Sequence, residues 1–223
     1  MKYLYLLMVW FFFPACSTMQ FPPPPELEGY AYAYAPEIAQ KCEQYYAHGN
    51  WQFVHSITFR MANGHGATVI GVTVLDEKII KTALMGVEGF VLFEAELDAE
   101  KSLNITRALP PFDNNDFAAG LMRDVKAIFV LASEEKPVTA QLADGAFICR
   151  YSNTKQISDF SIQSDGSTRI HVYNADGNRT KTIMADSHSF IDGVRIPKQI
   201  QLSTYGLQAY TLKLELISAD KIK

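Results

Sequence analysis

Apolar and polar residues alternate along most of the chain beyond residue 50, which is the pattern of β-strands with one buried face. In residues 51–61 the apolar side chains fall on one face, and Gln, Ser, Thr and Arg fall on the other. Turn signals separate the alternating stretches, the strongest being Asn-Gly-His-Gly at 63–66. The pattern predicts strands at 51–61, 67–75, 78–84, 89–97, 102–107, 138–142, 146–151, 157–163, 168–173, 180–184, 194–203 and 207–217.

The period changes from two to that of a helix at two places. In residues 117–132 the apolar residues follow the i, i+4, i+8 spacing of one helical face, and Asn114 or Asn115 can cap the start. Arg123 and Asp124 are expected on the solvated face, the alternative being that a lid helix uses Arg123 to meet a lipid headgroup. A second helix is predicted for residues 36–47, because Pro36 is well placed in a first helical turn.

About eleven strands are more than a small closed barrel needs. We therefore expect a mainly β (α+β) fold, a single curved antiparallel sheet that forms a half-open β-barrel. The amphipathic helix 117–132 is expected to cover it as a lid.

The first residues form a different kind of segment. Residues 1–15 hold one basic residue, Lys2, then an apolar stretch too short to span a membrane, and a small residue before Cys16. This predicts a lipoprotein signal peptide at 1–15 with Cys16 as the lipidated residue, although Phe13 and Pro14 depart from the usual motif. The alternative is ordinary secretion with a coincidental cysteine.

A short uncharged segment follows the cysteine and contains four consecutive prolines. Proline runs form semi-rigid spacers, so residues 16–35 are expected to be a tether and residues 36–223 a single β domain. Residues 26–35, in which tyrosine alternates with alanine, can form a short strand or an extended arm. Ser17 is not the aspartate that, in the bacterial lipoproteins this leader resembles, retains the protein at the inner membrane. The resemblance therefore implies the periplasmic face of the outer membrane of a diderm bacterium.

The composition limits the kinds of partner that this protein can bind. The net charge is −4 and becomes one unit more negative when Lys2 leaves with the leader. This argues against nucleic acid, which needs a basic patch. Without Cys16, Cys42 and Cys149 remain, and these two either form a long-loop disulfide or stay as buried thiols.

The order of these elements resembles a known family. The resemblance is carried by residues 55–75, 89–97 and 120–131, and by the ending Arg-Ile-Pro-Lys-Gln-Ile-Gln-Leu at 195–202. They are similar to the lipoprotein-carrier fold of LolA and LolB, and within it to a family of bacterial lipoproteins of about this length. The resemblance implies a concave apolar face that holds acyl chains. LolB-type acceptors also expose a leucine on a protruding loop, and residues 84–87 are the nearest equivalent here.

A site for an acyl chain needs apolar and aromatic side chains with few polar groups, and a space of at least about 300 Å³ between the helix and the sheet. These residues can equally fill a closed core, and the sequence leaves both interpretations open. The inward-facing set is Phe53, Ile57, Phe59, Met61, Val72, Phe93, Phe117, Leu121, Val125, Phe129, Tyr210, Leu212 and Leu214.

Nothing in the sequence demands catalysis. The histidines show no spacing typical of metal ligands, no GxSxG motif is present, and no metal or cofactor is expected. His55 falls on an apolar face, where it is either a core residue or a partner for Asp186 in a hydrolase. Residues 186–189 (Asp-Ser-His-Ser) are expected to form a polar loop.

The sequence therefore predicts a monomeric, non-enzymatic outer-membrane lipoprotein. It would bind an acyl chain, a lipid or a lipidated partner and pass it to the membrane or to a periplasmic carrier protein. The alternatives are a scaffold lipoprotein with a filled core and a lipid or acyl-ester hydrolase.

Overall fold

The computed structural model describes residues 22–27, 31–32, 35–76, 78–98, 102–130, 136–142, 145–206 and 209–222, so the leader and Cys16 lie outside the described residues. These residues form thirteen strands and two helices. In chain order they are β1 (Ala31–Tyr32), α1 (Pro36–Glu43), β2 (Trp51–Met61), β3 (Gly66–Leu75), β4 (Ile79–Met85), β5 (Val91–Asp98), β6 (Leu103–Ala108), α2 (Asn115–Phe129), β7 (Val138–Gln141), β8 (Phe147–Ser152), β9 (Gln156–Ile162), β10 (Thr168–Asn174), β11 (Arg179–Ile191), β12 (Val194–Thr204) and β13 (Tyr210–Lys221).

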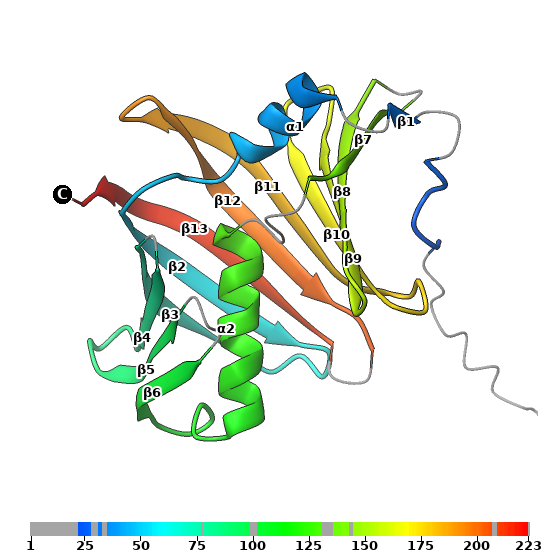
Figure 1. Cartoon of the computed structure of the whole chain (residues 1–223). Coiled ribbons are helices and arrows are strands. Elements are labelled where there is room, and N and C mark those ends of the chain that lie inside the picture. Colours follow the sequence, from blue (N-terminus) through cyan, green and yellow to red (C-terminus); the bar gives the residue numbers. More distant parts are fainter. Residues whose placement is uncertain are drawn as a thin grey trace, which may run out of the picture.

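All thirteen described strands belong to one antiparallel sheet in the order β1-β7-β8-β9-β10-β11-β12-β13-β2-β3-β4-β5-β6. The sheet curves strongly without closing (Figure 1). It consists of two meanders, β2–β6 and β7–β13, which are joined where β13 pairs with β2 along most of its length. The predicted mainly β, half-open single sheet is confirmed.

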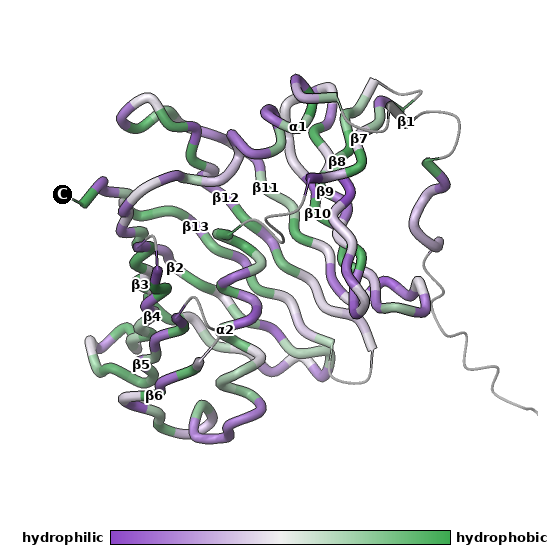
Figure 2. The backbone as a smooth tube through the Cα atoms, in the orientation of Figure 1, coloured by the Kyte–Doolittle hydropathy of each residue, from purple (hydrophilic) through white to green (hydrophobic). Residues whose placement is uncertain are grey.

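Both helices lie on the concave side of this sheet, with α2 across the middle of the cup and α1 over β8 and β9 (Figure 1). Figure 2 shows hydrophobic and hydrophilic positions alternating along the strands and along α2. The side chain of Asn114 caps α2 by accepting hydrogen bonds from the backbone N–H groups of Asp116 and Phe117 at 2.9 and 3.1 Å.

The two helices are shorter than predicted. Helix α2 ends at Phe129 rather than 132 because Val130 has extended backbone angles. Helix α1 ends at Glu43 rather than 47, and the next residues form a tighter turn in which Tyr46 N–H donates to the Glu43 carbonyl. This turn places the rings of both Tyr45 and Tyr46 against Phe160, at 5.0 and 5.9 Å between centroids.

The polar residues 186–189 lie in a strand, so the predicted loop is wrong. Strand β11 runs on to Ile191 and pairs with β12 as far as Val194. Ser187 adopts a positive φ of 50° and interrupts the pairing between Asp186 and His188. Polar side chains do not end the strand here because backbone pairing with β12 continues past them.

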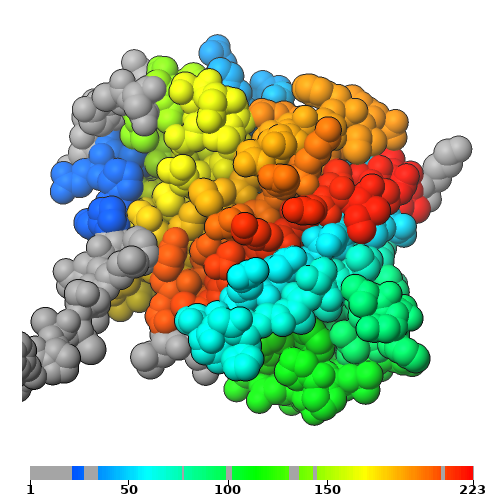
Figure 3. Space-filling view, turned by 180° about the vertical axis from the view of Figure 1, so that it is seen from behind, coloured from blue at the N-terminus to red at the C-terminus, as the bar shows by residue number. Residues whose placement is uncertain are grey.

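The N-terminal segment 22–27 packs against the domain instead of standing free. Leu27 is buried with Ala140 and Ile148, and the Pro25 carbonyl accepts a hydrogen bond from the Arg150 guanidinium at 2.9 Å. Two residues of the tyrosine-alanine stretch form β1, which pairs with β7. In Figure 3 this blue segment lies beside the convex face, whose surface is formed by β10–β13 and β2.

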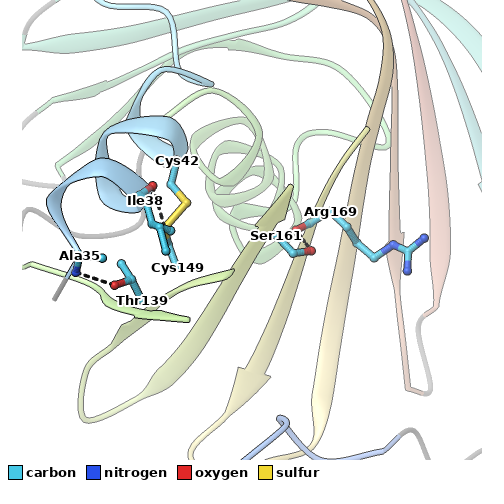
Figure 4. The surroundings of a disulfide bond; sticks show 7 residues. All are labelled: Ala35, Ile38, Cys42, Thr139, Cys149, Ser161 and Arg169. Carbon is cyan, nitrogen blue, oxygen red and sulfur yellow. Dashed lines mark hydrogen bonds between the residues drawn. A yellow bond between two sulfur atoms is a disulfide. The ribbon is translucent and has the colours of Figure 1, made fainter. Parts of the chain in front are cut away.

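A disulfide between Cys42 and Cys149 joins α1 to β8 and closes a loop of 107 residues (Figure 4). Both cysteines are fully buried. The N–H of Ala35, just before α1, donates to the Thr139 hydroxyl at 2.8 Å. Helix α1 is therefore fixed to the meander β7–β13 at both ends, by a hydrogen bond just before its start and by a covalent bond near its end.

Replacing both cysteines (Cys42→Ala with Cys149→Ala) is expected to lower the free energy of unfolding by about 4 kcal/mol, because the bond restricts a long loop in the unfolded chain. Denaturant unfolding of the variant and the native chain measures the difference. The native chain under reducing conditions is the control and should lose a similar amount. A loss below about 1 kcal/mol would contradict this account.

Candidate functional site

The concave face carries a continuous apolar row on the paired strands β2 and β13. The pairing places Ile57 beside Leu214, Phe59 beside Leu212 and Met61 beside Tyr210. Exposure rises along β2 from Phe53, at 3%, to Met61, at 41%. The row is therefore deeply buried at one end and partly open at the other.

Helix α2 closes the buried end of this row. Phe129 stacks on Phe53 with 5.2 Å between ring centroids and lies 5.7 Å from the His55 ring. Val125 is buried, and Leu121 is half-buried against the same cluster. The helix thus fills the cup with the apolar face that its sequence spacing predicts.

The start of α2 contacts the same cluster through Phe112. Phe117 meets Phe112 at 5.6 Å between centroids, and Phe112 meets the fully buried Phe93 of β5 at 5.7 Å. Phe93 and Phe117 are thus on the concave side but are linked through Phe112, which the sequence analysis did not single out.

Val72 does not join this set, and its predicted inward position is wrong. It pairs with Val54, which lies on the opposite face of β2 from Phe53 and His55. The inward positions of β3 are Gly71 and Thr73. A Cβ on Gly71 would lie 2.4 Å from the Ile57 Cδ1 atom, so the small residue admits the Ile57 side chain. Apolar residues on both faces of β3 concealed its orientation.

Between the described residues of α2 and the sheet, the cavity is far smaller than the space that the sequence analysis expects for a bound chain. The cavity at the end of α2, lined by Phe53, His55, Ile128, Phe129 and Ile200 among others, measures about 20 Å³. That volume holds about one water molecule, whereas small-molecule sites begin near 300 Å³. A chain can enter at this position only if α2 moves.

Asp124 is buried at 1% exposure, so its predicted place on the solvated face of α2 is wrong. One carboxylate oxygen accepts from the Lys181 ammonium of β11 and the other from the Tyr210 hydroxyl of β13. Burial and the adjacent Asp124 carboxylate raise the pKa of Tyr210 well above its usual value. The contact fixes the middle of α2 to two strands of the sheet.

The spacing could have revealed this position. Asp124 is three residues after Leu121 and four before Ile128, so it lies on the stripe that turns toward the sheet. Lys181 shares a strand face with Ile183 and Ala185, which are both buried. A charged residue at an inward position of each element is a signal that the two can pair.

The pairing of His55 with Asp186 is excluded by the register. His55 lies opposite Leu216 on the concave face. Asp186 lies opposite Gln199, exposed on the convex face. Burial lowers the pKa of His55 to about 4, so this side chain is neutral at pH 7 and packs as a core residue.

The turn between β4 and β5, near the predicted loop 84–87, exposes apolar side chains. Val87 and Phe90 are 69% and 72% exposed, whereas Leu84 is buried in the core. The exposed apolar residues of this turn are thus a valine and a phenylalanine.

The described part of the chain contains neither a helix that could cross a membrane nor a cluster of metal-ligating side chains. Neither described helix is long and apolar enough to cross a membrane. Among the same residues, no group of three or more His, Cys, Asp or Glu side chains is arranged to hold a metal ion.

Comparison with known proteins rests on structure. No protein-family model matches the sequence, and no curated protein matches it. A LolA superfamily protein from Nitrosomonas europaea matches with a TM-score of 0.58 at 10% identity, covering 85% of this chain and 94% of that one. This chain has the LolA-like fold.

Two further structures are less similar. A DUF1329 family protein from Desulfovibrio piger has a TM-score of 0.47 at 9% identity, covering 83% of this chain and 90% of that one. A domain described as a putative outer membrane lipoprotein-sorting protein, from Vibrio parahaemolyticus, has a TM-score of 0.46 at 10% identity. The match covers 82% of this chain and 90% of that one. At such identities the LolA-like match concerns the curved sheet and its helices, and the side chains in the cup are this chain's own.

Stability is expected to fall by about 3 kcal/mol between pH 7 and pH 4 because of His55 alone. Its pKa is about 4 in the folded protein and near 6.5 when unfolded, so the unfolded chain takes up the proton first as the pH falls. His55→Leu should remove this part of the decline, as measured by denaturant unfolding at each pH. His171, whose pKa burial also lowers to about 4, remains in both proteins. An identical decline in the variant would contradict the assignment.

Proposed function

We propose that this protein binds an acyl chain, carried by a lipid or a lipidated partner, along the concave face of its sheet and transfers it without chemistry. The observation that carries the proposal is the apolar row on β2 and β13, which is covered by a single helix and partly open beyond it. The LolA-like fold supports the same assignment. The protein would act as a carrier or acceptor and not as an enzyme.

Binding would proceed by exchange of α2 for the ligand. The cavity of about 20 Å³ is too small for a chain, so the contacts of Phe129, Val125 and Leu121 with the sheet would be replaced by contacts with the ligand. A buried methylene contributes about 0.8 kcal/mol, so a chain of about fifteen methylenes gains roughly 12 kcal/mol. This free energy offsets a substantial part of the free energy lost when the contacts of α2 with the sheet are broken.

The anchor would hold the cup close to its source of lipid. In this proposal Cys16 carries the lipid, and the protein lies on the periplasmic face of the outer membrane. Pro25 is hydrogen-bonded to the domain through its carbonyl, and the nine residue steps from Cys16 to Pro25 span at most about 32 Å. The domain would therefore stay next to the bilayer, from which it can receive a chain or to which it can deliver one from a periplasmic carrier.

The filled cup gives specific support to a second function, a scaffold lipoprotein whose interior never opens. Native mass spectrometry of the full chain, extracted from membranes under mild conditions, separates the two. A co-purifying lipid in addition to the covalent anchor supports the carrier. Its absence, together with failure to bind an added fatty acyl probe, supports the scaffold.

A polar substitution on the concave face is expected to weaken chain binding. Phe59→Ser should raise the dissociation constant of the fluorescent probe methyl cis-parinarate about tenfold or more, because a buried aromatic side chain contributes about 1.5–3 kcal/mol. Val72→Ser is the matched control, since Val72 is half-buried on the opposite face. Equal losses in the two variants would contradict a concave site.

A further inference from the structure

Lys181 is a cation placed at an inward position of the apolar cup. On the same face of β11, Ile183 and Ala185 are buried, and the register sets Lys181 between Val172 of β10 and Thr204 of β12. Its side chain is 24% exposed. An ammonium group in such a position is costly unless an anion or a hydrogen-bond acceptor lies against it.

The carboxylate paired with Lys181 lies on α2, the helix that must move for a chain to bind. The Asp124 carboxylate on α2 accepts from the Lys181 ammonium and from the Tyr210 hydroxyl. When α2 leaves the sheet, both donors lose this acceptor. Both remain on the sheet, because they belong to β11 and β13.

The two donors lie at the open end of the apolar row. Tyr210 is paired with Met61, the most exposed residue of the row, and its ring lies 5.5 Å from that of Phe59. An amphiphile whose polar end lies at Lys181 and Tyr210 can therefore extend its chain over Phe59 and Ile57 toward Phe53. This is the arrangement of an apolar site with a few polar groups that fix orientation.

We propose that Lys181 and Tyr210 bind the anionic headgroup of an acyl amphiphile, whose carboxylate or phosphate takes the place of the Asp124 carboxylate. This rests on the proposed chain-binding function and specifies its ligand class. An anionic ligand restores a partner to the half-buried ammonium, whereas a neutral one leaves it without a counter-ion. The site thus selects ligands that carry a negatively charged headgroup as well as an acyl chain.

The test compares cis-parinarate with its methyl ester, which have the same chain but carry an anionic carboxylate and a neutral methyl ester, respectively. The full chain, kept in solution with an amphipol, should bind the acid about tenfold more tightly than the ester, the size of one charge-assisted hydrogen bond. Lys181→Met should abolish this preference. Lys213→Met, on the exposed face of β13, is the matched control and should keep it.

Two variants guard against misfolding and against simple loosening of the helix. Asp124→Asn with Lys181→Met leaves no unpaired buried charge and should still bind both probes, without preference. Asp124→Asn alone removes the internal competitor and should strengthen binding of the acid more than binding of the ester. Equal strengthening of the two would show only a looser helix and would overturn the headgroup site.

The source of the anion is decided by competition. Displacement of cis-parinarate by palmitate indicates a carboxylate ligand, displacement by hexadecyl phosphate indicates a phosphate ligand, and either supports the site. Displacement by inorganic phosphate alone would overturn it in favour of a free-anion site. Equal affinity of the native chain for acid and ester overturns the headgroup site but leaves the proposed function intact. Binding of neither probe overturns both.

Discussion

The contact between α2 and the concave face of the sheet is the interaction on which the rest of this structure depends. An open sheet of thirteen described strands has an apolar concave face that must be covered, and the two ends of the sheet do not meet to cover it. Helix α1 covers the β8–β9 side and is held there by the Cys42–Cys149 disulfide. Helix α2 covers the centre and is held by side-chain packing and by Asp124.

Helix α1 is thus held covalently, whereas α2 is held by non-covalent contacts alone. A chain cannot share the cup with α2, because the cavity beneath the helix is about 20 Å³. In the proposed function, helix and ligand would therefore compete for the same apolar surface. In such a competition the buried Asp124 contact would set which ligands can replace the helix, since the cation that it neutralises stays on the sheet.

Much of the fold could be predicted because each strand shows its buried face as a period of two. The central pair β2 and β13 has clear alternation, and its inward residues were assigned correctly from Phe53 to Leu214. Val72 was misplaced because β3 is apolar on both faces, so alternation gave no direction. Only the neighbouring strand, through Gly71 and Ile57, determines which face is inward.

Polar residues at buried positions were the harder part of the site. Because their side chains are polar, Asp124 was assigned to the solvated face of its helix and residues 186–189 of β11 to a loop. Contacts with residues distant in sequence determine where both lie. Lys181 and Tyr210 hold Asp124 from 57 and 86 residues away. The cavity volume also could not be predicted, because the same apolar residues serve a filled core and a binding site.

The central claim, that α2 and an acyl chain exclude one another, is tested most directly by a distance measurement. Spin labels at Arg123→Cys on the exposed side of α2 and at Lys213→Cys on the convex face of β13 report how far the helix lies from the sheet. The measurement is made with and without palmitate, in samples where binding is verified by mass spectrometry. The account predicts a longer distance when palmitate is bound. An unchanged distance in a protein saturated with palmitate would contradict it.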